Sequence, residues 1–187
     1  MQATYEKESA HLTSLGIVHE PFIGLDNSLF RLNPEDTFDV DRKGDKIGHK
    51  QVCACMSHYL MWKAALYCQG DAFWFLEYDA EFVPDWRPRY EQAMSVLPND
   101  WDVLFLGSCC CQGLPTRHLG KNLYQVLYPL CGHALMIRKK ALPVLLHHHQ
   151  KVWGPLDIAM KMTSLPNLNS FVILPRIANQ RATPLAP

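Results

Sequence analysis

The sequence predicts a single compact α/β domain, with a mostly parallel sheet and helices on both faces. Predicted strands and helices alternate along the chain, which favours parallel strands joined by helical crossovers. The run from Phe73 to Leu76 is continuously apolar, as in a strand that is buried on both faces of such a sheet. The chain has 187 residues, 48% of them hydrophobic and 19% charged, which suits one ordinary globular domain.

Composition weighs against several classes of protein. Lys plus Arg equals Asp plus Glu at 18 each, so the chain has no overall field to gather nucleic acid or an anionic membrane. No apolar run approaches the roughly 20 residues of a membrane span, and the start of the chain is too polar for a signal peptide. The seven cysteines, three of them consecutive, suit a reduced compartment better than a disulfide framework. We therefore expect a cytoplasmic protein.

Residues 1–26 are predicted to hold a first helix and a first strand. The helix covers residues 3–15 and ends at the stop signal Gly16. The strand covers residues 17–23, with Pro21 at a sheet edge or bulge. Residues 27–46 are irregular and predict a surface loop, of a length that usually means function or disorder. Residues 47–181 form the expected core, and residues 182–187 a tail.

Periodic apolar positions and proline or glycine breaks place the elements of the core. The predicted helices cover residues 50–67, 89–97, 138–146 and 155–162, and the predicted strands after the first acidic one cover residues 101–107, 130–137 and 171–175. Three histidines, residues 147–149, follow the third of these helices. Because they point in different directions around one helical turn, they are interpreted as a solvated helix end.

The apolar run at residue 73 leads into acidic residues. Glu77, Asp79 and Glu81 are spaced by two, so they project from one face if the strand continues. Ligands of open α/β sheets bind beyond the carboxyl ends of strands. Carboxylates suit Mg²⁺ or Mn²⁺, and substrate phosphates complete the shell when only one or two carboxylates bind the ion. A nucleotide diphosphate fits that shell; the alternative is a solvated strand end with ordinary turn chemistry.

Three segments of the core carry a family resemblance. The helix of residues 47–63 contains Gly48, Cys53, Ser57 and His58 and ends in Trp-Lys; residues 75–80 form a strand that ends in Leu-Glu-Tyr-Asp; residues 97–107 read Leu-Pro-Asn-Asp-Trp-Asp and end in Leu-Gly. In this order they resemble glycosyltransferase family 25, which includes lipooligosaccharide and procollagen galactosyltransferases. Further similar segments are residues 132–134, 155–157 and 175–180, so the likeness covers about residues 10–181.

The resemblance implies a GT-A-like (Rossmann-like) fold and a metal-dependent, inverting hexosyltransferase. Its donor would be a nucleotide sugar, with a UDP-sugar favoured, and its acceptor a hydroxyl of a glycan such as lipooligosaccharide. Glu77 and Asp79 match the outer acids of the family's Glu-Asp-Asp motif, and His133 matches the histidine of a later strand, which makes these three the expected ligands of Mn²⁺ or Mg²⁺. Asp157 matches the aspartate of a Pro-x-Asp motif and is the candidate catalytic base.

A further set of residues is expected to contact donor or acceptor. This set comprises Ser57, His58, Tyr78, Glu81, Gly107, Gly132 and Gln180. For Ser57 and His58 the alternative is a satisfied contact within the core.

The chain departs from the family pattern in two places. Tyr78 replaces the middle acid, and the chain starts at a helix that in the family follows a strand and a basic turn. Two alternatives therefore remain beside the glycan transferase: transfer of a sugar to a hydroxymethylated base in DNA, and a catalytically inactive relative that serves as a binding or scaffold protein.

Overall fold

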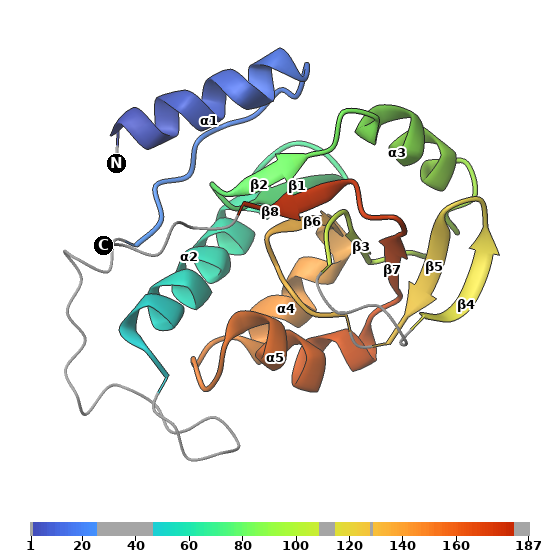
Figure 1. Cartoon of the computed structure of the whole chain (residues 1–187). Coiled ribbons are helices and arrows are strands. Elements are labelled where there is room, and N and C mark those ends of the chain that lie inside the picture. Colours follow the sequence, from blue (N-terminus) through green and yellow to red (C-terminus); the bar gives the residue numbers. More distant parts are fainter. Residues whose placement is uncertain (1, 26–46, 109–114, 128, 182–187) are drawn as a thin grey trace.

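The computed structural model describes residues 2–25, 47–108, 115–127 and 129–181 (Figure 1). The loop expected over residues 27–46 and the tail of residues 182–187 lie outside the described residues. Among the described helices, none combines the length and the apolar character that crossing a bilayer requires.

A mixed six-stranded sheet runs through the centre of the molecule (Figure 1). Its strands are β1 (Ala72–Leu76), β3 (Val103–Phe105), β4 (Pro115–Gly120), β5 (Leu123–Val126), β6 (Ala134–Arg138) and β7 (Ser170–Ile173), in the spatial order β1-β6-β3-β7-β5-β4. Of its neighbouring pairs, β3 and β7 are parallel and the rest are antiparallel. The mixed α/β class is confirmed, but the prediction of a mostly parallel sheet is wrong.

The error has a physical reason, because an apolar run reports burial and not strand direction. β6 reads like any central strand, yet it lies antiparallel between β1 and β3. The hairpin of β4 and β5 lies between the predicted strands over residues 101–107 and 130–137, where the sequence predicts neither a helix nor a strand. Its two-residue loop is Lys121 and Asn122, because Gly120, the last residue of β4, pairs with Leu123; Gly120 and Lys121 have positive φ, 116° and 51°.

Helices cover both faces of the sheet, as expected. The α-helices are α1 (Gln2–Ser14), α2 (His49–Ala65), α3 (Trp86–Met94), α4 (Leu142–His148) and α5 (Leu156–Ala159), and α5 continues as a π-helical turn, Met160–Ser164. One apolar layer joins α2, α4 and α5 to the sheet, and the other joins α3 to its opposite face. In β3, Val103 and Phe105 enter the first layer and Leu104 enters the second, the alternation of a strand between two layers.

The predicted strand over residues 17–23 is absent. These residues form no strand, and Val18 is fully exposed while Ile23 is 84% exposed. A strand needs a partner for its backbone groups, and Pro21 removes one donor. The apolar alternation of this segment therefore misled the prediction.

The acidic strand also differs from the expectation. β1 ends at Leu76, a turn follows, and β2 (Ala80–Phe82) pairs with β8 (Ala178–Gln180) in a separate two-stranded sheet. Glu77, Asp79 and Glu81 therefore do not share one strand face. The prediction that β1 is buried on both faces is also wrong. β1 is the outermost strand at one side of the sheet, and Phe75 is its one buried residue.

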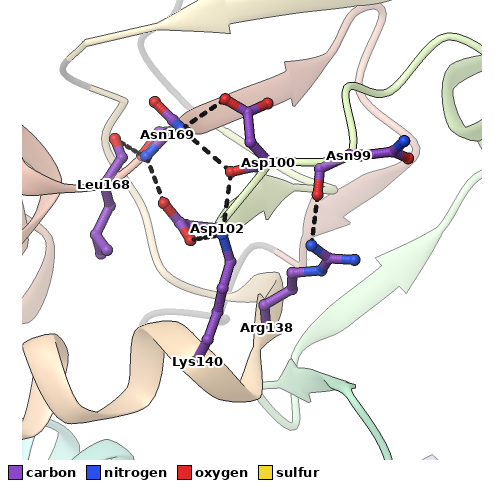
Figure 2. Close-up of polar contacts among 8 residues, drawn as sticks. Asn99, Asp100, Asp102, Arg138, Lys140, Leu168 and Asn169 are labelled. Carbon is purple, nitrogen blue, oxygen red and sulfur yellow. Dashed lines mark hydrogen bonds and ion pairs between the residues drawn. The ribbon is translucent and has the colours of Figure 1, made fainter.

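A polar network closes one end of the sheet (Figure 2). Asp102, which precedes β3, accepts a hydrogen bond from the backbone N–H of Asn169, which precedes β7, at 2.9 Å. The same carboxylate pairs with Nζ of Lys140 at 2.9 Å, and the side chain of Asn169 donates to Asp100 at 3.1 Å. These contacts tie the amino ends of β3 and β7 to the end of β6.

His149 corrects the interpretation of the three histidines. It is 8% exposed, and its Nε2 lies 3.2 Å from Oγ of Ser164. The ring of Trp62 packs edge-on against it at 5.3 Å. Burial first, and then the nearby His148 and His58, lower the pKa of His149 to about 4. The residue that follows α4 is thus buried and not solvated, because it packs against the π-helical turn that carries Ser164.

This burial makes stability depend on pH. In the unfolded chain His149 binds a proton below its ordinary pKa of 6.5, whereas the folded chain resists protonation until about pH 4. Stability contributed by neutral His149 is therefore full above pH 6.5 and is lost as the pH falls towards 4, by about 3 kcal/mol. We expect His149→Gln to flatten the curve of unfolding free energy against pH in urea titrations. His147→Gln, at an exposed position, is the control, and parallel curves for the two variants would contradict this account.

Candidate functional site

The directions of the strands bring the predicted site residues to one edge of the sheet. β6 is antiparallel to both β1 and β3, and β3 is parallel to β7, so β1, β3 and β7 run the same way. Their carboxyl ends meet at one edge, and β6 begins there. Residues that follow β1 and β3 therefore lie beside residues that precede β6, in spite of the antiparallel strand between them.

A cavity of about 260 Å³ opens at this edge. Its lining comes from α2, the end of β1, the start of β6, the start of α5 and the end of β8. The lining residues are Gln51, Ala54, Glu77, Cys131, Gly132, His133, Pro155, Leu156, Asp157 and Gln180. Five of them were singled out from the sequence: Glu77, Gly132, His133, Asp157 and Gln180. Two carboxylates and an imidazole thus share one cavity, in which the described lining includes no Lys or Arg.

Glu77 is held in this cavity from two sides. Its backbone N–H donates to the carbonyl of His133 at 2.8 Å, which extends the pairing of β1 with β6 by one residue. Its Oε1 lies 3.0 Å from Nε2 of His58 on α2. Burial acts to raise the pKa of Glu77, but the hydrogen bond from His58 and the charges of His58 and His133 outweigh burial and lower it. Glu77 is therefore an oriented carboxylate at neutral pH.

Asp79 lies in the turn between β1 and β2, and it is 6% exposed. Its Oδ2 accepts a hydrogen bond from Nε2 of Gln180 at 3.1 Å. Its Oδ1 is buried and has no hydrogen-bond partner among the described residues. Burial raises the pKa of Asp79; the bond from Gln180 opposes this rise, and the charge of Glu77 adds to it. A buried carboxylate oxygen without a partner calls for an explanation, and a bound ion is one of the usual ones.

His133 is 1% exposed and packs against Gly107, the residue that ends the β3 segment. Its Nε2 lies 3.3 Å from the carbonyl of Ala178, so it donates there, and Nδ1 is buried without a hydrogen-bond partner in the described part of the chain. A neutral imidazole that donates from Nε2 keeps a lone pair on Nδ1. A Cβ at position 107 would overlap both Nε2 of His133 and the carbonyl of Ala178. Glycine at 107 is what allows this approach.

Asp157 stands on the first turn of α5, after Pro155. Its Oδ2 accepts from the backbone N–H of Cys131 at 3.1 Å, and its Oδ1 accepts from the N–H of Ile158 at 2.9 Å. Cys131 has a positive φ of 72°, a backbone conformation that turns its N–H towards the carboxylate. Asp157 is thus fixed in one orientation on the wall of the cavity.

Cys131 also bears on the expected redox state. It is disulfide-bonded, whereas Cys53, Cys55 and Cys68 form no disulfide. The cysteine pattern favours a reduced compartment over a disulfide framework, and the disulfide at Cys131 weighs against that expectation.

Five predicted contact residues do not line the cavity: Ser57, His58, Tyr78, Glu81 and Gly107. The hydroxyl of Ser57 donates to the carbonyl of Cys53 and accepts from the N–H of Leu25, so it anchors the end of the first described segment. His58 is buried behind Glu77. Tyr78, at the tip of the turn, is 56% exposed, and Glu81 is exposed on β2.

Sequence reasoning missed Gln51, Ala54 and the backbone of Cys131. Gln51 reads as an ordinary first-turn residue, and its side chain caps α2 by accepting from the N–H of Gly48 at 3.0 Å. No sequence signal marks it as a cavity residue. A positive φ at a cysteine is equally invisible in the sequence.

The three expected metal ligands are near one another but differ in their surroundings. Glu77 and His133 line the cavity, whereas Asp79 is packed against Gln180 beside it. Among the described residues, no group of three or more His, Cys, Asp and Glu side chains is arranged to hold a metal ion. Any ion would therefore depend on one or two protein carboxylates and on further ligands.

The comparison with known proteins does not name a family. No protein-family model matches the chain, and no curated protein matches it significantly.

The contact at Gly107 can be tested directly. We expect Gly107→Ala to destabilise the chain by about 1–3 kcal/mol, because the added methyl group forces His133 or the Ala178 backbone to move. Gly154→Ala is the matched control, since a Cβ there meets no atom within 4 Å. Both variants are compared by urea unfolding. Equal stability of the two would show that the approach of His133 to Gly107 is not tight.

Proposed function

We propose that this chain is a metal-dependent hexosyltransferase with a GT-A-like catalytic domain. It would transfer a sugar, with inversion, from a nucleotide sugar, a UDP-sugar, to a hydroxyl of a glycan. The observation that carries the proposal is Asp79, a buried carboxylate with an unpartnered oxygen, beside a cavity that holds Glu77, His133 and Asp157. The common direction of β1, β3 and β7 supports it further, because ligands of open sheets bind at the carboxyl ends of strands.

The residues present suit a hard divalent cation. Carboxylate oxygens are the ligands that Mn²⁺ and Mg²⁺ prefer, and such ions accept few protein ligands when substrate phosphates complete the shell. Asp79, through its Oδ1, and Glu77 would hold the ion, and substrate phosphates would supply the remaining ligands. When bound, the cation neutralises the charge that develops on the departing nucleotide diphosphate. Its binding would also give the buried Oδ1 of Asp79 a partner.

Asp157 is the proposed base. Two backbone N–H groups fix its carboxylate on the cavity wall, and each oxygen has a second lone pair free to accept. In the reaction, the acceptor hydroxyl gives its proton to Asp157 while its oxygen bonds to the anomeric carbon. The bond from that carbon to the diphosphate oxygen breaks on the opposite side, which inverts the sugar carbon. His58 stays buried behind Glu77 and holds it in place.

The donor site is tested by calorimetric titration of UDP and UDP-sugars with and without Mn²⁺. We expect nucleotide binding that requires Mn²⁺ in the native chain and that weakens by at least about tenfold in Asp79→Asn, because the variant loses one charge of the ion site. Glu81→Gln makes the same change of charge two residues away, at a residue outside the cavity lining, and should bind as the native chain does. If the native chain binds no nucleotide under any condition, the transferase proposal fails.

The base is tested by Asp157→Asn. We expect a fall of about 10² to 10⁴ in the rate of UDP release in the presence of a glycan acceptor. Donor affinity should stay within a factor of about two, since Asp157 would act on the acceptor and not on the diphosphate. A loss of donor affinity that matches the loss of rate would assign Asp157 to donor binding instead.

A further inference from the structure

The last described residues of the chain connect the candidate site to α1. Gln180, at the end of β8, donates to Oδ2 of Asp79, and the backbone N–H of Arg181 donates to the carbonyl of Asp79 at 2.8 Å. The turn that carries Asp79 is thus held twice by two consecutive residues. Whatever fixes residues 180 and 181 also fixes Asp79.

The strand pairing alone is a weak support for these residues. Among the described strands β8 pairs with β2 alone, over three residue pairs, and the N–H of Ala178 at its start also donates to the carbonyl of Leu106 at 3.1 Å. Gln180 lies at the other, exposed end of β8, and strand ends fray more readily than their centres. A further anchor at this end would hold residues 180 and 181 against the turn.

α1 provides that anchor. Oε1 of Glu8 accepts from Arg181 Nη1 at 2.7 Å and Oε2 accepts from Nη2 at 3.1 Å, a two-pronged ion pair. Glu8 is 8% exposed, so the pair is shielded on the carboxylate side. α1 is itself fixed by the guanidinium of Arg87, which donates to the carbonyl of Leu15 at 2.9 Å. Figure 1 shows α1 lying along the β2 and β8 side of the molecule.

We propose that Glu8 is a positioning residue of the candidate site, which acts on Asp79 through Arg181. The inference rests on the proposed function for its effect on metal affinity, but its structural part does not. Glu8 precedes Asp79 by about seventy residues and does not line the cavity. Its role is to hold residues 180 and 181, which donate two hydrogen bonds to Asp79.

Hydrogen exchange of the full chain without metal tests the structural part. In Glu8→Gln we expect the amides of Arg181 and Ala80 to exchange about tenfold faster, because an ion pair becomes a weaker neutral contact. The amides of β3 should keep their protection, which would distinguish local release from loss of global stability. Glu6→Gln, at an exposed position of the same helix, should exchange like the native chain. Unchanged exchange at Arg181 and Ala80 in Glu8→Gln would overturn the proposal.

Mn²⁺ titration by calorimetry tests the functional part. We expect Glu8→Gln and Arg181→Gln each to weaken Mn²⁺ binding about tenfold, the low end of the range for residues that support a metal ligand. The charge-swapped double variant Glu8→Arg with Arg181→Glu should recover most of that affinity, which a general loss of packing would not allow. Native affinity in both single variants would overturn the functional part. If the native chain binds no Mn²⁺, the proposed function fails by itself, and hydrogen exchange still decides whether Glu8 positions Asp79.

Discussion

The antiparallel pairing of β1 with β6 is the constraint on which the candidate site depends. In such a pair the end of one strand faces the start of the other, and here Leu76 pairs with Ala134. The next residues, Glu77 and His133, must then be neighbours, and the backbone bond between them continues the ladder. Because β6 also pairs with β3, the same constraint sets Gly107 against His133. A carboxylate, an imidazole and a glycine from three distant segments thus meet through backbone pairing, with no need for long or flexible side chains.

The site is built across the two apolar layers of the domain. Its α2 and α5 walls belong to the layer on one face of the sheet. Asp79 directly precedes β2, and Gln180 ends β8; the apolar residues of this small sheet pack in the layer on the other face. The polar atoms at this seam are either paired within the protein, as in Asp157, or buried and unpaired, as in Asp79 and His133. The unpaired atoms are costly in a folded chain, and a site that a ligand completes is a common reason to keep them.

Sequence patterns predicted the positions of most helices and strands and some of the residues that line the cavity. The acids after the run at Phe73, the Gly-His before β6 and the aspartate after Pro155 could be predicted, because each follows a clear break in an apolar pattern. Strand direction could not, since burial on both sides looks the same for β3 and β6. The apolar residues at 17–23 suggested a strand, but only a partner could make one. The burial of His149 and the position of Gln51 in the cavity lining depend on how α4 and α2 pack against the rest of the domain. No local sequence pattern predicts that packing.

The edge position of β1 has a consequence of its own. Within the described part of the chain, no strand pairs with its free edge, and residues 72–76 contain neither a charge nor a proline. Natural sheets usually guard such edges with charges, prolines or bulges, because bare backbone groups template the addition of another strand. β1 has none of these guards. Within the described part of the chain, the strand that leads into the candidate site is therefore also a strand whose outer backbone groups are open to pairing with another chain.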